Sequence, residues 1–165
     1  MINKKKILAV IPAKGTSKRI KKKNTIKIFK NLRLLDFTFN AIKKSKYIDD
    51  FFISTEDKKL KKISKQIGFR NFINRPRKLS QEQSETTEVI FHAIKNIKKK
   101  YDIILILQLT SPLRTGSDID KSLEKFIKKK YNSLCSISYS KKKNKFGLKI
   151  NKNGYLKRID YTENK

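Results

Sequence analysis

The stretch ILAVIPAKGTSKRIKKKN, residues 7–24, decides the fold of this chain. It opens with five apolar residues, too few for a helix and rich in β-branched side chains, which indicates a buried parallel strand. Pro12 ends the strand because it has no backbone N–H to give to the sheet. One glycine, two hydroxyl side chains and six cations follow before Asn24. We expect this loop to bind phosphate through backbone N–H groups near Gly15 and through its cations, although the sequence contains neither a P-loop nor a dinucleotide-binding glycine motif.

The composition favours an anionic partner without specifying one. The 165 residues suit a single domain, and the formal net charge is +29 with a pI near 10.3. The cations are 36 Lys and only 7 Arg, and they occur in every segment. Proteins that read nucleic acid usually concentrate charge on one face and favour Arg for bidentate contacts. The charge therefore predicts general affinity for polyanions and does not require dedicated nucleic-acid recognition.

Cysteine and hydropathy patterns predict a cytoplasmic protein. Cys135 is the single cysteine, so no intrachain disulfide can form. No apolar run approaches the length of a membrane span. We interpret Cys135 as a small apolar residue within a buried strand at residues 133–138.

Strand and helix patterns alternate along the chain. The spacing of apolar residues predicts the following elements: strands at residues 7–11, 50–54, 69–73, 102–107 and 133–138, and helices at residues 34–46, 58–67, 86–99 and 118–129. This order predicts an α/β fold, a doubly wound and mostly parallel sheet with helices on both faces. Ligands bind such sheets at the carboxyl ends of the strands, which singles out loops 12–24, 54–57, 74–87 and 108–117. We assign residues 1–140 to this core and residues 141–165 to a hairpin turned at Asn153-Gly154.

Three of these loops together carry a specific resemblance. They read IPAKGTSKR followed by Lys23-Asn24, then RPRKLSQEQSET with His92 further on, and then QLTSPLRTGSDID. They resemble the signature segments of the acylneuraminate cytidylyltransferases, also called CMP-sialic acid synthetases, which are sugar nucleotidyltransferases with a Rossmann-like fold. The resemblance covers residues 7–120, and TSPLR after a hydrophobic strand is its most specific part. Residues 141–165 would then be the start of a sugar-binding or dimerisation part.

The resemblance implies an enzyme that transfers CMP from CTP to a nonulosonic acid, with release of diphosphate and Mg²⁺ on the phosphates. It also implies a homodimeric assembly if the family's dimerisation element is present. It implies catalytic roles for Lys23, which would stabilise charge on the α-phosphate, and for Lys14. The implied nucleotide-binding residues are Ala13, Lys14, Gly15, Ser17, Lys18, Arg19, Lys23, Asn24, Arg75 and Ser84. The implied residues facing the sugar and the ribose are Gln108, Thr110, Ser111 and Arg114.

The sequence departs from the family pattern at several positions. Lys14 replaces an Arg and loses the bidentate fork, Thr16 replaces a Gly, Glu82 replaces an Asp, and Leu109 replaces a Pro. In relatives, which are longer, the metal-binding aspartates lie largely beyond the matched region. We therefore name no metal ligand, and Asp160 is only a weak candidate.

Several alternatives stay open. The sugar acid is sialic, legionaminic or pseudaminic, activated with CMP or even GMP, or the chain is a truncated inactive homologue. In a different class, a lysine-rich nucleic-acid-binding domain would bind with steep salt dependence and without preference for CTP. Individual residues also have simpler interpretations: Ser17, Thr110 and Ser111 as turn formers, Arg75 as an extended loop residue before Pro76, His92 as a packed helix residue, and Asp118 and Asp120 as first-turn helix charges.

Overall fold

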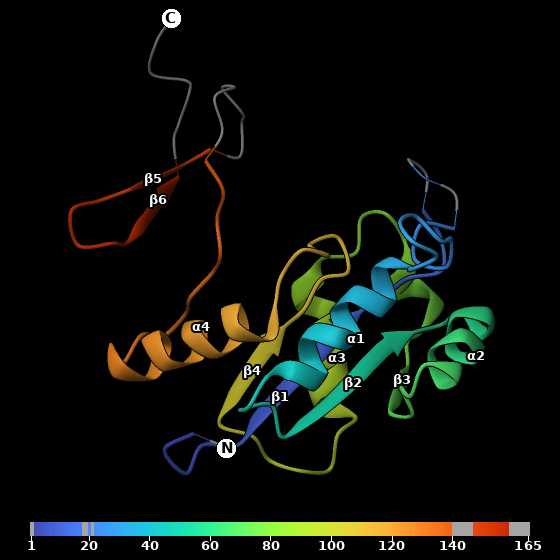
Figure 1. Ribbon diagram of the computed structural model, residues 1–165, viewed down its shortest axis with the longest axis horizontal. Helices are drawn as coiled ribbons and strands as arrows, with labels where there is room; N and C mark the ends of the chain where they lie inside the picture. Colours follow the sequence, from blue (N-terminus) through green and yellow to red (C-terminus); the bar gives the residue numbers. More distant parts are fainter. Residues whose placement is uncertain (1, 18–19, 21, 140–146, 159–165) are drawn as a thin grey trace, which may run out of the picture. The chain divides into compact units, whose positions relative to one another are not determined.

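The computed structural model describes residues 2–17, 20, 22–139 and 147–158 (Figure 1). The chain divides into two compact units, Met1–Asn132 and Ser133–Lys165. The first unit contains the whole parallel sheet, and the second contains a small hairpin. The assignment of residues 1–140 and 141–165 to different functional parts stays a prediction.

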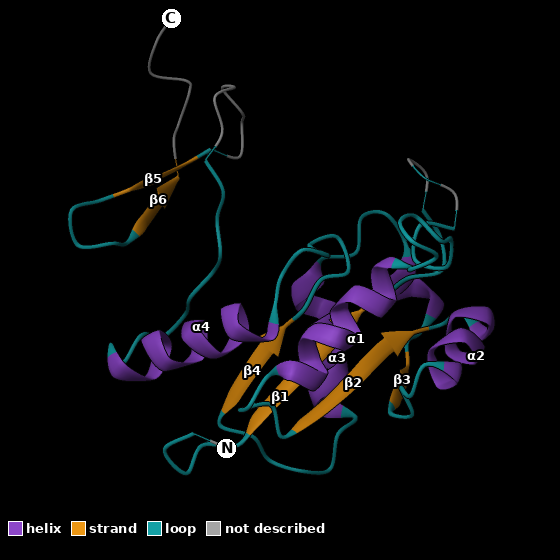
Figure 2. Cartoon of the chain, viewed as in Figure 1, coloured by secondary structure: helices purple, strands orange, loops and turns teal. Residues whose placement is uncertain are grey.

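Four parallel strands form the sheet of the first unit. They are β1 (Ile7–Pro12), β2 (Asp50–Thr55), β3 (Phe72–Asn74) and β4 (Ile103–Ile106), in the order β3-β2-β1-β4 (Figure 2). The chain steps outward from β1 to β2 and β3, and then crosses to the opposite side of β1 to form β4. The winding direction therefore reverses between β1 and β4. Such a reversal opens a crevice at the carboxyl ends of the strands.

Helices cover both faces of this sheet. Helices α1 (Leu34–Lys44), α2 (Lys58–Gln66) and α4 (Gly116–Lys128) pack apolar side chains against one face of β1, including that of Ile11. Helix α3 (Thr86–Lys95) packs Ile90 and Ala93 against Leu8 and Val10 on the other face. Strand β1 is apolar on both faces because both are buried, as a central parallel strand requires. The predicted doubly wound α/β fold is confirmed.

The helix boundaries follow local capping. The Asp57 carboxylate accepts the N–H groups of Lys59 and Leu60 and so begins α2. Helix α4 begins at Gly116, two residues before the predicted start, because Thr115 and Asp118 form a capping box. Helix α3 ends at Lys95, before the predicted residue 99. A short 3₁₀ helix, η1 (Arg77–Ser80), lies between β3 and α3.

The two predicted first-turn aspartates of α4 have different roles. Asp118 is the expected cap charge, and its hydrogen bonds with Thr115 are the main reason that its pKa lies below the usual value. Asp120 is buried and does more than complement the helix dipole. Its carboxylate accepts hydrogen bonds from the Ser45 hydroxyl at 2.6 Å and from the Lys46 N–H at 3.1 Å, which ties the end of α1 to α4.

The predicted strand at residues 133–138 is wrong. Alternation of Ser with Leu, Cys and Ile favours a strand, but a strand also needs a ladder partner, and none of the strands in the described part of the chain pairs with these residues. Leu134 and Ile137 are 37% and 48% exposed, and Cys135 is exposed, so it is not a core residue.

The predicted hairpin is confirmed. Strands β5 (Leu148–Ile150) and β6 (Leu156–Arg158) are antiparallel, and the Gly154 N–H closes the turn on the Asn151 carbonyl at 2.9 Å. Gly154 has φ +82°, a conformation that glycine adopts without strain. None of the helices among the described residues combines the length and the apolar character needed to cross a membrane.

Candidate active site

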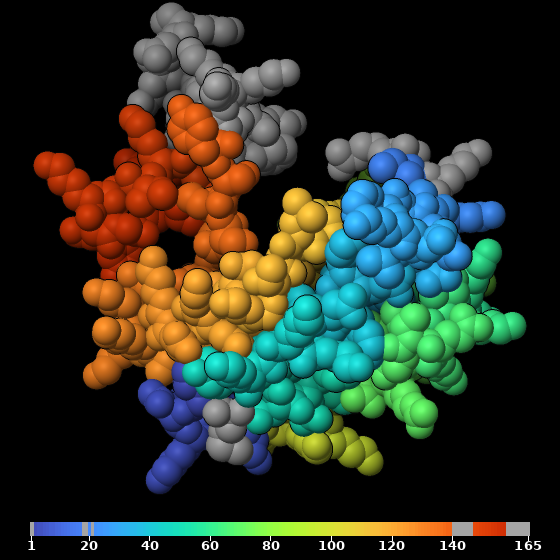
Figure 3. Space-filling view, in the orientation of Figure 1, coloured from blue at the N-terminus to red at the C-terminus, as the bar shows by residue number. Residues whose placement is uncertain are grey.

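An open cleft of about 200 Å³ lies at the carboxyl ends of the strands, where the winding direction reverses. Residues of three predicted loops meet there, and the segments after β1 and after β4 lie side by side (Figure 3). The lining residues are Pro12 at the end of β1 and Lys14, Thr16, Lys23 and Asn24 after it; Arg75, Leu79, Gln81 and Ser84 between β3 and α3, with Thr86 and Val89 on α3; and Gln108, Leu109 and Thr110 after β4. The fourth predicted loop, between β2 and α2, lies directly behind this wall and supports it.

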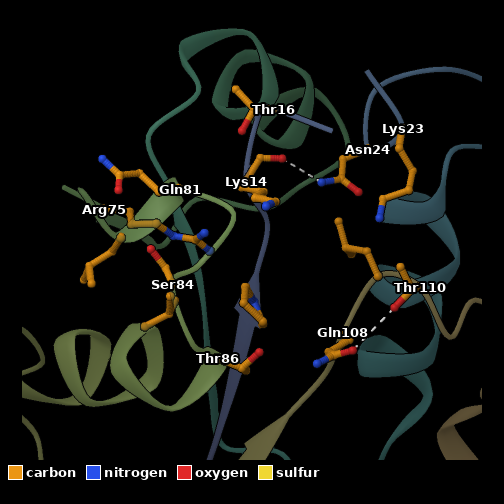
Figure 4. A pocket seen from close by; sticks show the side chains of 14 residues that line it. Lys14, Thr16, Lys23, Asn24, Arg75, Gln81, Ser84, Thr86, Gln108 and Thr110 are labelled. Carbon is orange, nitrogen blue, oxygen red and sulfur yellow. Dashed lines mark hydrogen bonds between the residues drawn. The ribbon is translucent and has the colours of Figure 1, made fainter. Parts of the chain in front are cut away.

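The charge of the cleft is positive. Lys14, Lys23 and Arg75 contribute cations from two loops, and the lining residues include no carboxylate (Figure 4). Cations in a recess act in a lower effective dielectric than cations on an open surface, so their attraction for an anion is stronger. The cleft is therefore suited to a polyanion that also carries polar groups for Gln81, Thr86 and Gln108.

Arg75 is held rigidly beneath the cleft. Its residue is 6% exposed, its Nη2 donates to the Ser54 carbonyl at 2.8 Å, and its Nε lies 3.4 Å from the Ser54 hydroxyl. Burial lowers the pKa of the Arg75 guanidinium, and the nearby charge of Glu56 opposes that shift. A guanidinium remains charged in any case. Arg75 therefore supplies a fixed positive charge from the end of β3.

Glu56 lies behind the first loop and fixes its backbone. Its Oε1 accepts the Gly15 N–H at 2.8 Å. Burial by itself raises the pKa of this carboxyl, but the Ser80 hydroxyl, the Gly15 N–H and the charge of Arg75 favour the carboxylate, and the net pKa lies below its usual value. The Ala13 N–H is likewise bonded, to the Ser54 carbonyl at 3.0 Å. Two N–H groups that were expected to be free for phosphate are thus hydrogen-bonded inside the protein, which leaves the side-chain cations as the positive groups at the cleft.

Gly15 is required by close approach, not by a positive φ. A Cβ built at Gly15 would lie 2.7 Å from the Asp57 Cβ and would also overlap the Asp57 carboxylate, which caps α2. We expect Gly15→Ala to lower the free energy of unfolding by about 1–3 kcal/mol, since the loop or the helix cap must move. Thr16→Ala removes only a 3.5 Å contact with the Ser80 carbonyl and should change stability by less than about 0.5 kcal/mol. Urea unfolding of both variants tests this, and equal stabilities would contradict it.

The first loop returns to the cleft through Lys23 and Asn24. A turn with hydrogen bonds from Thr25 N–H and Ile26 N–H to the Lys22 carbonyl fixes this segment. The Asn24 Nδ2 donates to the Lys14 carbonyl at 2.8 Å, so the two ends of the loop are joined at the cleft wall. This bond places Lys14 and Lys23 at the same opening (Figure 4).

The loop after β4 contributes Gln108 and Thr110 to the wall, while Arg114 supports it from behind. Arg114 Nη2 donates to the Gln108 carbonyl at 3.3 Å, and burial lowers the pKa of this guanidinium. The Ser111 N–H also donates to the Gln108 carbonyl, which closes the turn. Arg114 and Ser111 thus shape the loop that carries Gln108.

Half of the site residues expected from the sequence meet at this cleft. Those that line it are Lys14, Lys23, Asn24, Arg75, Ser84, Gln108 and Thr110. Those that lie outside its lining are Ala13, Gly15, Ser17, Ser111 and Arg114, while Lys18 and Arg19 fall outside the described residues. His92 is half-buried on α3 with its Nε2 3.3 Å from the Asn96 amide nitrogen, which fits a packed helix residue.

Sequence reasoning missed three polar residues of the wall, Thr16, Gln81 and Thr86. Gln81 and Thr86 belong to the segment QEQSETT, between Arg75-Pro76 and the first apolar residue of α3. A run of amide and hydroxyl side chains at the start of a helix, on the ligand-binding edge of a parallel sheet, is the signal that points to them.

Comparisons with known proteins agree with this geometry. A family model described as cytidylyltransferase matches residues 8–160. The chain belongs to the cytidylyltransferase family. It is 29% identical to the N-acylneuraminate cytidylyltransferase of Escherichia coli, over 83% of this chain and 32% of that protein. It is 28% identical to the pseudaminic acid cytidylyltransferase of Campylobacter jejuni, over 81% of this chain and 58% of that protein.

This cytidylyltransferase-family chain also shares its fold with solved nucleotidyltransferases. The structure of CMP:2-keto-3-deoxy-manno-octonic acid synthetase complexed with CTP matches with a TM-score of 0.62 at 17% identity, over 74% of this chain and 48% of that one. A cytidylyltransferase from Leptospira borgpetersenii matches with a TM-score of 0.60 at 22% identity, over 75% and 50%. These matches establish the Rossmann-like fold of the chain.

The pKa of Glu56 lies below its usual value, so we expect its bond to the first loop to weaken in acid. A carboxyl with a folded-state pKa below its unfolded value stabilises the fold above the unfolded pKa, about 4.3, and loses that contribution as the pH falls through the folded value. We expect Glu56→Gln, whose side-chain carbonyl can still accept the Gly15 N–H, to reduce the loss of stability between about pH 6 and pH 3. Urea midpoints measured across this range test it. Glu124→Gln, at an exposed carboxylate on α4 that accepts the Tyr47 hydroxyl at 2.8 Å, is the matched control and should change the pH dependence less than Glu56→Gln does.

Proposed function

We propose that this chain carries the nucleotide-binding core of an enzyme that transfers CMP from CTP to a nonulosonic acid of the sialic type, with release of diphosphate. Relatives named for N-acylneuraminate, pseudaminic acid and N,N′-diacetyllegionaminic acid match the chain at 27–29% identity, and they support this class of sugar acid without singling out one member. The chain spans 32% of the length of the N-acylneuraminate cytidylyltransferase of Escherichia coli and 58% of that of the pseudaminic acid cytidylyltransferase of Campylobacter jejuni. The expected location is the cytoplasm, and the expected assembly is a homodimer.

The observation that carries the proposal is the meeting of Lys14, Lys23 and Arg75 in one cleft without a carboxylate among the lining residues. A triphosphate with about four negative charges fits such a recess. The three cations come from two loops, so they can contact different parts of a polyphosphate chain at once. Gln81, Ser84 and Thr86 on the β3–α3 side offer hydrogen-bonding groups for the neutral base.

Transfer of CMP requires alignment of the attacking hydroxyl with the α-phosphorus and stabilisation of the negative charge that develops on the phosphates. The anomeric hydroxyl oxygen of the sugar acid forms a bond with the α-phosphorus, the bond from that phosphorus to the bridging oxygen of the diphosphate breaks, and the hydroxyl proton passes to solvent. Negative charge grows on the leaving diphosphate and on the α-phosphate oxygens. In this proposal Lys23 stabilises the α-phosphate, Lys14 and Arg75 hold the rest of the nucleotide, and Gln108 and Thr110 orient the sugar acid. All five residues line the same cleft.

The described part of the chain contains no preformed protein site for Mg²⁺. No group of three or more His, Cys, Asp or Glu side chains is assembled there, and the cleft lining contains only neutral and cationic side chains. Mg²⁺ prefers carboxylate and phosphate oxygens. The described residues therefore do not fit a resident magnesium ion, and Asp160, the weak candidate from the sequence, lies outside them. Within the proposal Mg²⁺ enters with the phosphates of CTP.

Thermal unfolding of the chain with CTP, ATP, GTP and UTP, each with Mg²⁺ at near-physiological salt, tests the proposal. A ligand that binds only the folded state raises stability by RT ln(1 + [L]/Kd), about 2.7 kcal/mol at one hundred times Kd. We expect CTP to raise the unfolding midpoint more than the other nucleotides. Diphosphate release with a panel of nonulosonic acids then identifies the acceptor. Equal shifts with all four nucleotides, or none, would overturn the proposal and leave polyanion binding by a lysine-rich surface.

A further inference from the structure

Exposed apolar side chains are concentrated in residues 26–32, which follow the first loop and which we call the outer turn. Ile26, Ile28 and Phe29 are 36%, 49% and 59% exposed, and the turn lies beyond the start of α1 (Figure 1). None of its residues lines the cleft. Single exposed apolar side chains are normal on a protein surface, but three within four residues indicate a binding surface.

Hydrogen bonds hold the outer turn in this shape. The Ile28 N–H donates to the Leu32 carbonyl at 2.8 Å, and the Leu32 N–H donates to the Phe29 carbonyl at 2.7 Å. The central residues Lys30 and Asn31 have φ +44° and +60°, and a positive φ at both central positions is typical of a type I′ turn. A lysine adopts a positive φ only at a cost in free energy. The turn is therefore a defined structure that keeps Ile28 and Phe29 at the surface.

The charged side chains of the outer turn are all cations. Lys27 and Lys30 are exposed, and the Lys30 Nζ lies 5.5 Å from the centroid of the Phe29 ring. Residues 1–35 contain no Asp or Glu. No ion pair among the residues that the structure describes involves Lys27 or Lys30. The outer turn thus presents apolar groups beside positive charge that no described carboxylate neutralises.

Three classes of partner carry negative charge, and they differ in what they offer to the apolar side chains. Nucleic acid offers bases on which Phe29 can stack but little apolar surface for isoleucine. Protein interfaces are depleted in lysine. An anionic bilayer offers lipid phosphates to Lys27 and Lys30 and acyl chains to Ile28 and Phe29, and the flexible stem of lysine lets its ammonium group reach the headgroups. The composition of the outer turn therefore favours a membrane surface.

We propose that the outer turn docks this chain on an anionic membrane surface, with Ile28 and Phe29 inserted among the lipids and Lys27 and Lys30 paired with lipid phosphates. The inference does not depend on the function proposed for the cleft, because the two surfaces share no residue. A single turn buries little apolar area, so docking is reversible and requires both the apolar and the charged contribution. Since Lys23 lies three residues before the turn, docking holds the cleft close to the membrane.

Tryptophan fluorescence tests the inference, because the sequence contains no Trp and a single introduced Trp reports on its own position. Phe29→Trp and Phe91→Trp are each mixed with vesicles of phosphatidylcholine alone, or of phosphatidylcholine with phosphatidylglycerol, at near-physiological salt. Phe91 is the matched control, since it is 72% exposed on α3 and outside the outer turn. Vesicles with brominated acyl chains quench a Trp only where it enters the bilayer.

We expect anionic vesicles to shift the emission of Phe29→Trp to shorter wavelength and brominated lipids to quench it, while Phe91→Trp shows neither effect. Ile28→Ser combined with Phe29→Ser should weaken binding to the same vesicles about tenfold, measured by co-sedimentation, whereas Phe91→Ser, with the same net charge, should not.

Three results would overturn the inference and leave attraction by net charge alone: no quenching at position 29, equal quenching at both positions, or equal binding by the double serine variant and Phe91→Ser. Sedimentation velocity without lipid covers the remaining occupant. Self-association of the wild type that the double serine variant abolishes would assign the outer turn to an interface between copies of this chain, and it would overturn the inference as well.

Discussion

Lys23→Ala should lower kcat by about 10²–10³-fold while the chain remains folded. Lys23 lies half-buried in the wall of the cleft, and no carboxylate lines that cleft to neutralise it. Under the proposed function, a cation in that position would stabilise charge that grows on the α-phosphate during transfer, so its removal would cost more in the transition state than in the ground state. CTP affinity should fall by less than the turnover number. Steady-state kinetics of CMP transfer, with thermal unfolding as a folding check, measure both effects.

The neighbouring lysine provides a matched control. Lys22 is exposed and does not line the cleft. Lys22→Ala therefore removes a charge of the same kind one residue away from Lys23. Its effect on kcat should stay within about threefold, because a solvated charge outside the recess is screened. Near-normal turnover in Lys23→Ala, or equal losses in the two variants, would show that the total charge of the loop matters and that the position of Lys23 does not.

Regular elements could be predicted from the sequence because their signals are local. The apolar runs of β1 and β4 and the amphipathic spacing in α1 and α3 appear within a few consecutive residues. Their order then determines the sheet and places the loops at one edge. This is why Lys14, Arg75 and Gln108, which are far apart in the sequence, could be expected to meet.

The sequence predictions that failed have a common physical cause: each concerned a structure that depends on a partner distant in the sequence. The alternation at residues 133–138 is a local strand signal, but only a neighbouring strand completes a ladder, and Leu134 and Ile137 remain partly exposed. The bond between Glu56 and Gly15 joins residues 41 positions apart and removes an N–H that local reasoning assigned to phosphate. Glu56 carried no signal of its own in the sequence, since a glutamate before a helix is ordinarily a capping or dipole residue.

The cations of the cleft differ in how far they are buried. Lys14 and Lys23 lie in the wall and are partly exposed to solvent, whereas Arg75 is buried and bonded to Ser54. Glu56 approaches the same region from behind and favours the positive charge of Arg75. A buried cation with a carboxylate on its inner side and an open cleft on its outer side can attract an anion without requiring a bound counterion when the cleft is empty.

Arg75→Ala should therefore weaken both the fold and the site. It removes the 2.8 Å bond to the Ser54 carbonyl and the cation opposite Glu56, so the free energy of unfolding should fall by about 2–3 kcal/mol. Affinity for CTP should fall at least tenfold, because a preoriented charge is lost from the cleft. Urea unfolding and calorimetric titration at a temperature where the variant is folded measure the two effects separately.

Two variants separate the position of Arg75 from its charge. Arg77 follows two residues later, on η1, and is exposed, so Arg77→Ala should change stability by less than about 0.5 kcal/mol and CTP affinity by less than about threefold. Arg75→Lys keeps the charge but cannot bond both Ser54 atoms, and it should recover part of the affinity but little of the stability. If Arg75→Ala left CTP affinity unchanged while stability fell, Arg75 would be a structural residue beneath the cleft, and phosphate binding would rest on Lys14 and Lys23.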